Sequence, residues 1–260
     1  MTPLLHVTTP AWSPMTVSID TLTERDIAKT IDHSLLRPEL DDAFVEDGCR
    51  LAAKYDVASV CVRPADVRRA KAILDGTDVA VGTTIGFPHG NHTTAIKVAE
   101  AQVALADGAT ELDMVIQIGA LKSGRDADVE ADIRAVVEVA HAAGAIVKVI
   151  FENAYLTDDE KIRACRLTEA AGGDFVKTST GFAPSGATHD DLRLMRANTS
   201  PHVGVKAAGG VRTLDALLAV MELGVTRIGA TATETMICDF RARKAGEAPG
   251  GATATETGGY

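Results

Sequence analysis

The segment Gly173-Asp174-Phe175-Val176-Lys177-Thr178-Ser179-Thr180-Gly181 is a short apolar run with a lysine at its centre and a glycine at its end. The segment Val203-Gly204-Val205-Lys206-Ala207-Ala208-Gly209-Gly210 repeats this pattern. A buried strand rarely tolerates an unpaired ammonium group, because desolvating the charge is costly unless the group is paired or loses its proton. Two such strands in one chain therefore indicate chemistry.

Short apolar runs alternate with amphipathic segments along most of the chain. The runs predict strands at 31–36, 57–63, 79–87, 111–116, 146–152, 174–179, 203–208 and 227–230. Helical patterns fall at 43–55, 65–74, 93–107, 129–143, 158–171, 190–197, 213–223 and 234–243. Eight βα units predict an α/β fold of the (β/α)8 TIM-barrel type. A doubly wound open sheet is the alternative, weakened by the absence of a GxGxxG motif after the first strand.

The composition agrees with a covered parallel sheet. Of the 260 residues, 46% are hydrophobic and only 4% aromatic, so Ala, Val, Ile and Leu must form most of the core. The formal net charge of −10 argues against nucleic-acid and membrane partners, and any phosphate must be bound locally. The four cysteines form no CxxC pair, and neither a signal peptide nor a long apolar span is evident. We therefore expect a reduced, cytoplasmic protein without disulfides.

The chain divides into a single domain with two extensions. Residues 1–22 contain prolines and hydroxyl residues without a period, and they are interpreted as a leader. The barrel domain is expected at 23–244, with Thr23 capping a first short helix. Residues 245–260 are rich in Gly, Ala, Thr and Glu, which predicts a flexible tail ending in Tyr260.

Four predicted strands carry an ionisable residue inside an apolar run: Asp113, Lys148, Lys177 and Lys206. A buried Asp–Lys pair can also stabilise a barrel without catalysing anything. Three lysines against one or two acids, however, favour the loss of a proton from one lysine, and a neutral amine attacks carbonyl groups. The pattern predicts a Schiff base at the carboxyl ends of the strands, where barrel enzymes place their active sites.

Glycines and hydroxyl residues follow three consecutive predicted strands. They occur at Ser179-Thr180-Gly181, Gly209-Gly210-Val211-Arg212 and Gly229-Ala230-Thr231. Backbone N–H groups in such turns can approach an anion, and barrels often bind phosphate after their last two strands. A single such glycine would indicate only a turn, but the three together predict a phosphate site.

Two histidines, His89 and His92, lie three residues apart in a predicted loop. They lack a third ligand at a regular spacing, so a loop or helix-capping role is favoured over a metal site. His33 is interpreted as a structural polar residue near the barrel mouth.

Four motifs in order resemble the deoxyribose-phosphate aldolase family of class I aldolases, which are (β/α)8 barrels. They are Gly86-Phe87-Pro88-His89-Gly90, Glu111-Leu112-Asp113-Met114-Val115, Lys177-Thr178-Ser179-Thr180-Gly181 and Val205-Lys206-Ala207-Ala208-Gly209-Gly210-Val211-Arg212. The resemblance extends from about Thr30 to Thr231. It implies reversible cleavage of 2-deoxy-D-ribose 5-phosphate to D-glyceraldehyde 3-phosphate and acetaldehyde, with no metal or organic cofactor. Family members are often dimers, so a homodimer is expected.

The resemblance also implies roles for individual residues. Lys177 would form the Schiff base, and Lys206 would be the neighbouring cation that disfavours its protonated form. Asp113 would move protons through an ordered water, with Lys148 in the same polar cluster. Cys61 matches a cysteine near the substrate aldehyde in some members, although an ordinary core role is favoured. The residues expected to bind substrate are Asp32, Ser34, Thr180, Gly181, Gly209, Gly210, Arg212, Gly229 and Thr231.

The chain departs from the family pattern at two positions. Ala232 replaces a serine that would contact phosphate, and Phe182 stands where some relatives carry lysine. Arg212 and backbone N–H groups would then attract the phosphate, and tolerance of unphosphorylated aldehydes is a hypothesis. Tyr260 stands where some members have a terminal tyrosine that assists proton transfer.

Alternative functions remain open from the sequence. They are another Schiff-base barrel enzyme such as a transaldolase-like protein, a metal-dependent aldolase or isomerase, and a non-catalytic sugar-phosphate binding protein.

Overall fold

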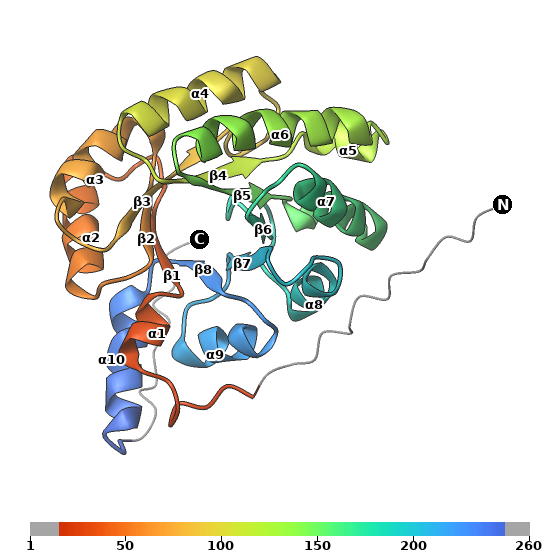
Figure 1. Ribbon diagram of the computed structural model, residues 1–260. Helices are drawn as coiled ribbons and strands as arrows, with labels where there is room; N and C mark the ends of the chain where they lie inside the picture. The colour runs from red at the N-terminus through yellow and green to blue at the C-terminus, as the bar shows by residue number, and fades with distance from the viewer. Residues whose placement is uncertain (1–15, 248–260) are drawn as a thin grey trace.

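The protein is a closed barrel of parallel strands surrounded by helices, as its computed structural model shows for residues 16–247 (Figure 1). The barrel order follows the chain, and β1 pairs with β8 to close it. The strands are β1 (Ile31–Leu35), β2 (Ser59–Val62), β3 (Ala80–Ile85), β4 (Glu111–Val115), β5 (Ile146–Ile150), β6 (Phe175–Lys177), β7 (Gly204–Ala208) and β8 (Arg227–Ala230). This confirms the predicted (β/α)8 architecture and excludes the open sheet.

Helices cover the outside of the barrel (Figure 1). They are α1 (Glu24–Ala28), α2 (Asp42–Lys54), α3 (Val67–Leu74), α4 (Thr94–Ala106), α5 (Ile118–Lys122), α6 (Asp126–Ala142), α7 (Asp158–Ala170), α8 (His189–Ala197), α9 (Leu214–Glu222) and α10 (Thr233–Lys244). Two 3-10 turns, η1 (Pro64–Asp66) and η2 (Asn153–Tyr155), lie in connections. Thr23 caps α1 in a capping box with Asp26, as expected.

The boundaries differ from the sequence prediction in two ways. Most strands end earlier than their apolar runs; β6, for example, ends at Lys177, and residues 178–179 already belong to the loop. Helix α5 was not predicted, because five residues are too few to show a helical period.

The core lies between the barrel and the helices. On β5, Val147 and Val149 belong to this core, whereas Lys148 between them contacts carboxylates on β1 and β4 inside the barrel. Strand residues alternate between the two sides, so one register places all inward side chains of neighbouring strands together. That register aligns Asp113 with Lys148 and Lys177 with Lys206.

The amino-terminal helix α1 packs against α10, where Arg241 forms an ion pair with Glu24 at 2.6 Å (Figure 1). Residues 1–15 and 248–260 lie outside the described part of the chain, and with them lie most of the predicted leader, most of the predicted tail and Tyr260. No helix within residues 16–247 is long and apolar enough to cross a membrane.

Candidate active site

Charged side chains fill the interior of the barrel and contact one another. We call them the lysine–carboxylate cluster. All of its members are buried, and they come from β1 and from β4 to β8. The members are Asp32, Glu111, Asp113, Lys148, Lys177, Lys206 and Arg227.

Asp113 lies at the centre of this cluster. Its Oδ2 accepts hydrogen bonds from Lys177 Nζ and from Lys206 Nζ, both at 2.7 Å, and its Oδ1 accepts one from Lys148 Nζ at 3.0 Å. Burial alone would raise the pKa of Asp113, but the ammonium groups of Lys148, Lys177 and Lys206 hold it well below its usual range. Asp113 therefore remains ionised and accepts hydrogen bonds from all three lysines.

Asp32 pairs with three cations, and it shares two of them, Lys148 and Lys206, with Asp113. The carboxylate of Asp32 forms ion pairs with Lys206 at 2.5 Å, Lys148 at 3.0 Å and Arg227 at 3.2 Å, and it accepts a hydrogen bond from Ser59 Oγ at 2.7 Å. Burial opposes ionisation, but these three cations lower the pKa of Asp32 below its usual range. Lys206 is thus held between two carboxylates.

Glu111 and Arg227 complete the cluster, and neither was predicted from the sequence as a site residue. Glu111 Oε1 accepts a hydrogen bond from Arg227 Nη2, and Glu111 Oε2 accepts one from Lys148 Nζ at 2.5 Å. Burial opposes charge on Lys148, yet Asp113, Asp32 and Glu111 raise its pKa well above the usual value. Burial likewise opposes charge on Arg227, and Asp32 and Glu111 raise its pKa. Both residues stand at the start of a predicted strand, a position that by itself does not indicate burial.

The charge balance differs from the sequence expectation of three lysines against one or two acids. The cluster contains three lysines and one arginine against three carboxylates. If every group were ionised, one positive charge would be in excess. Lys148 and Arg227 are held charged by their carboxylate neighbours, so the other two cations of the cluster are Lys177 and Lys206.

Lys177 is the lysine that stands at the carboxyl end of its strand, the end at which barrel enzymes place their active sites. It is the last residue of β6, and its side chain is 2% exposed. The Nζ atoms of Lys177 and Lys206 donate to the same oxygen of Asp113. Two such nitrogens lie within the distance of about 4–6 Å over which one positive charge disfavours another. Lys206 sits in the aligned position on β7 and pairs additionally with Asp32. The geometry therefore suits Lys177 as the amine and Lys206 as the retained cation.

The predicted glycine-rich turns lie at the same end of the barrel. Gly181, Gly209 and Gly210 have positive φ angles of 89°, 75° and 103°, a conformation that L side chains rarely adopt. The loop after β6 returns to β7, where Ala187 N–H donates to the carbonyl of Ala208 at 3.0 Å and to that of Gly209 at 2.9 Å. A Cβ atom at Gly186 would collide with the Gly209 carbonyl, so these loops approach backbone to backbone.

The remaining predicted residues occupy different positions around this end. Gly229 adjoins Lys206, because a Cβ there would lie 3.8 Å from Lys206 Cε. Arg212 and Thr231 are exposed. Thr180 is fully buried, and both its N–H and its hydroxyl donate to Glu152. Ser34 is buried on β1.

Cys61 and His33 are both buried. Cys61 on β2 is buried, and desolvation raises the pKa of its thiol to about 11, so the thiolate is scarce near neutrality. His33 Nδ1 and Thr233 Oγ1 are 2.9 Å apart inside the protein, in keeping with a structural role. Within residues 16–247 no group of three His, Cys, Asp or Glu side chains could hold a metal ion.

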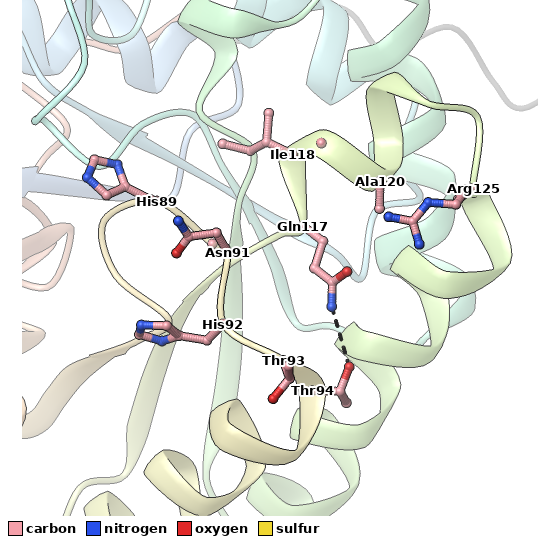
Figure 2. A pocket seen from close by; sticks show the side chains of 11 residues that line it. His89, Asn91, His92, Thr93, Thr94, Gln117, Ile118, Ala120 and Arg125 are labelled. Carbon is pink, nitrogen blue, oxygen red and sulfur yellow. Dashed lines mark hydrogen bonds between the residues drawn. The ribbon is translucent and has the colours of Figure 1, made fainter.

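His89 and His92 instead line a surface pocket of about 420 Å³ (Figure 2). This pocket lies between the loop after β3 and helix α5, and Gln117 and Arg125 contribute to its other wall. Gln117 Nε2 donates a hydrogen bond to Asp132 Oδ1 at 3.1 Å. None of the members of the lysine–carboxylate cluster lines this pocket.

Comparison with known sequences gives consistent matches over most of the chain. Residues 26–248 match the sequence model of the DeoC/LacD family aldolases. A deoxyribose-phosphate aldolase from Rhodopirellula baltica is 51% identical over 235 residues, which cover 90% of this chain and 97% of the relative. A deoxyribose-phosphate aldolase from Clostridium perfringens is 49% identical over 216 residues, with coverages of 83% and 96%.

Solved structures agree with the sequence matches. A crystal structure from Coccidioides immitis aligns with a TM-score of 0.82 at 38% identity, over 91% of this chain and 92% of that chain. The deoxyribose phosphate aldolase from Aeropyrum pernix, described as a tetramer, aligns with a TM-score of 0.80 at 29% identity, over 86% and 95% of the two chains.

Proposed function

The chain belongs to the DeoC/LacD family of aldolases, and from this membership together with its buried lysines we infer the reaction that it catalyses. It is a lyase that reversibly cleaves 2-deoxy-D-ribose 5-phosphate to D-glyceraldehyde 3-phosphate and acetaldehyde through a lysine Schiff base. The observation that carries the assignment of residues is the shared contact of Lys177 and Lys206 with one oxygen of Asp113.

In the proposed first step, the neutral amine of Lys177 attacks the aldehyde carbon of the open-chain sugar phosphate. The resulting carbinolamine loses water and becomes a protonated imine, which is an electron sink. Asp113, held ionised by its lysine neighbours, can accept a proton through one bridging water. Such a relay would remove the proton of the C3 hydroxyl.

Bond cleavage follows from this arrangement. The electrons of the C2–C3 bond move into the imine and form an enamine, while C3 becomes the aldehyde carbon of glyceraldehyde 3-phosphate. The enamine then takes a proton at its terminal carbon through the same relay. Water hydrolyses the imine, which releases acetaldehyde and restores the amine of Lys177. Lys148 and Asp32 are proposed to keep Asp113 and Lys206 in place.

The phosphate group is proposed to bind at the turns after β6, β7 and β8. Gly181, Gly209 and Gly210 would offer backbone N–H groups, and the exposed Arg212 and Thr231 would supply a charge and a hydroxyl. Thr180 would shape its loop rather than donate to phosphate, because Glu152 already accepts its hydroxyl and N–H.

Reductive trapping tests the assignment of the nucleophile. Incubation with deoxyribose 5-phosphate and borohydride, followed by peptide mass mapping, should place the adduct on Lys177. An adduct found only on Lys148 or Lys206, or no adduct at all, would overturn it. Lys177→Met should remove the adduct at every pH.

The domain bounds, the compartment, the oligomeric state, the role of Tyr260 and the independence from a cofactor are also proposed. The catalytic domain would span residues 23–244 of a cytoplasmic homodimer, although the Aeropyrum pernix relative is described as a tetramer. Light scattering of the purified protein would distinguish a dimer from a tetramer. Tyr260 would assist proton transfer, and its deletion should then slow exchange of the acetaldehyde methyl protons. The cofactor requirement is tested by activity after dialysis against a chelator, which should be unchanged.

A further inference from the structure

Glu152 is a buried carboxyl residue that lies outside the lysine–carboxylate cluster. It follows β5 by two positions and is only 2% exposed. Its backbone angles, φ 59° and ψ 65°, lie in the left-handed region. A residue other than glycine occupies this region at a cost that the surrounding structure must offset. A charged side chain in a strained and buried position indicates a specific contact.

That contact is with Thr180, three residues after Lys177. The carboxylate of Glu152 accepts the backbone N–H of Thr180, with Oε1 at 3.1 Å and Oε2 at 3.3 Å, and Oε2 also accepts its hydroxyl. The hydroxyl oxygen of Thr180 in turn accepts the N–H of Phe182 at 3.0 Å. Through the hydroxyl of Thr180, Glu152 is therefore linked to the backbone on both sides of Gly181.

Backbone hydrogen bonds hold the same two segments side by side. Phe151 N–H donates to the carbonyl of Lys177 at 3.0 Å, and Asn153 N–H donates to that of Thr178 at 2.9 Å. Glu152 lies between these two donors. These two backbone hydrogen bonds therefore fix the start of the 178–182 segment, and the contact of Glu152 with Thr180 fixes the rest of it.

The far end of this segment reaches the loop after β3. The ring of Phe182 packs edge-on against Phe87, with centroids 5.4 Å apart and an interplanar angle of 89°. A chain of contacts therefore runs from Glu152 through Thr180 to Phe182 and Phe87. Burial raises the pKa of Glu152, and hydrogen bonds from Thr180 partly oppose this shift.

We propose that Glu152 is a positioning residue for the phosphate end of the substrate: by holding Thr180, it sets the conformation in which Gly181 and its neighbours meet that group. The proposal rests on the proposed function. It separates two parts of the reaction, because imine formation with acetaldehyde needs Lys177 but not the phosphate-binding turn.

The test compares two reactions of each variant. Cleavage of deoxyribose 5-phosphate reports on the phosphate end, whereas exchange of the acetaldehyde methyl protons with solvent reports on Lys177 and the Asp113 relay without a phosphate group. Glu152→Ala should raise KM for the sugar phosphate about tenfold or more, the size expected for loss of hydrogen bonds to a charged group. Methyl proton exchange should remain at the wild-type rate.

Conservative variants make the test more specific, and they still give a result if Glu152→Ala does not fold. The amide in Glu152→Gln can still accept the Thr180 N–H, so its rise in KM should be smaller. Thr180→Val removes the hydroxyl at constant shape and should raise KM similarly. The double variant Glu152→Gln with Thr180→Val should be less than additive, because both changes break one chain of contacts. The exposed Glu138→Gln on α6 is the matched control and should leave KM unchanged.

The outcomes distinguish this proposal from the proposed function. Unchanged KM in Glu152→Gln and Thr180→Val, or an equal loss of cleavage and methyl exchange, would overturn the positioning role. A wild-type protein that exchanges methyl protons but does not cleave the sugar phosphate would instead contradict the proposed function.

Discussion

Lys177 and Lys206 donate hydrogen bonds to the same atom, Oδ2 of Asp113, and each nitrogen is 2.7 Å from it. The carboxylate favours charge on both amines, whereas each amine disfavours charge on the other. Lys206 has a second carboxylate partner, Asp32 at 2.5 Å, which Lys177 lacks in this arrangement. This asymmetry is the basis on which Lys206 is proposed as the retained cation and Lys177 as the nucleophile.

Removing the charge at position 206 should reveal this division. In Lys206→Met, Asp113 Oδ2 would pair with Lys177 without a second amine on the same oxygen and would stabilise its ammonium form, so borohydride trapping at pH 7 should decrease and recover as the pH is raised. Cleavage near neutrality should fall about 10²–10⁴-fold, the range for loss of a group that supports proton transfer. Trapping at pH 7 equal to that of the wild type would contradict the assignment. Lys71→Met, at an exposed lysine, is the control.

The charge balance of the lysine–carboxylate cluster can be tested by changing Glu111 and Arg227. Arg227→Met removes the excess positive charge, so the yield of trapped imine at pH 7 should fall, whereas Glu111→Gln should not lower it. Glu111→Gln combined with Arg227→Met keeps the excess at one charge and should restore the yield. Equal yields in the single and double variants would show that this pair does not influence Lys177.

The same variants carry a prediction for stability. Arg227→Met leaves Glu111 buried without its guanidinium partner, and removal of one member of a buried pair costs about 3–5 kcal/mol. Glu111→Gln in the same chain should recover most of this loss. The free energy of unfolding from urea titrations measures both effects, and an additive double variant would contradict the coupling.

Asp113→Asn should separate imine formation from proton transfer. The amide keeps an oxygen acceptor but cannot relay protons, and its neutral charge leaves the amines less favoured as ammonium groups. We expect borohydride trapping to persist at pH 7, whereas methyl proton exchange should fall about 10²–10⁴-fold. Exchange at the wild-type rate would remove Asp113 from the relay.

The sequence predicted the barrel and the central residues because their patterns are local. Each lysine stands in an apolar run, and so does Asp113, so the order of the strands brought Asp113, Lys148, Lys177 and Lys206 together. The partners of these residues depend on contacts across the barrel. Arg227 and Glu111 lie 116 positions apart, and a charged residue at the start of a strand is commonly exposed.

Glu152 was missed for a different reason. Its run ends in Phe151-Glu152-Asn153, which is an ordinary strand-to-loop boundary in sequence. Only the left-handed backbone at Glu152 turns its carboxyl group to Thr180. The sequence therefore predicted that Thr180 lies at the site, but it could not predict that the Thr180 hydroxyl donates to Glu152.

His33 provides a prediction for the pH dependence of stability. Burial lowers the pKa of His33 to about 4, whereas an unfolded chain has a histidine pKa of about 6.5. Between these values the unfolded state binds more protons, so stability contributed at this site is present above about pH 6.5 and is lost as the pH falls toward 4. From pH 7 to pH 5 the loss should be about 2 kcal/mol.

Comparison with His33→Asn isolates this contribution, because the amide does not titrate and can still bond Thr233. Carboxylates with lowered pKa values, such as Asp32 and Asp113, destabilise the protein only at lower pH and do so equally in both proteins. The difference in unfolding free energy between wild type and variant should therefore shift against the wild type by about 2 kcal/mol between pH 7 and pH 5. Urea titrations at pH 7, 6 and 5 measure it. A constant difference across these titrations would mean that His33 binds its proton equally well in the folded and unfolded chains.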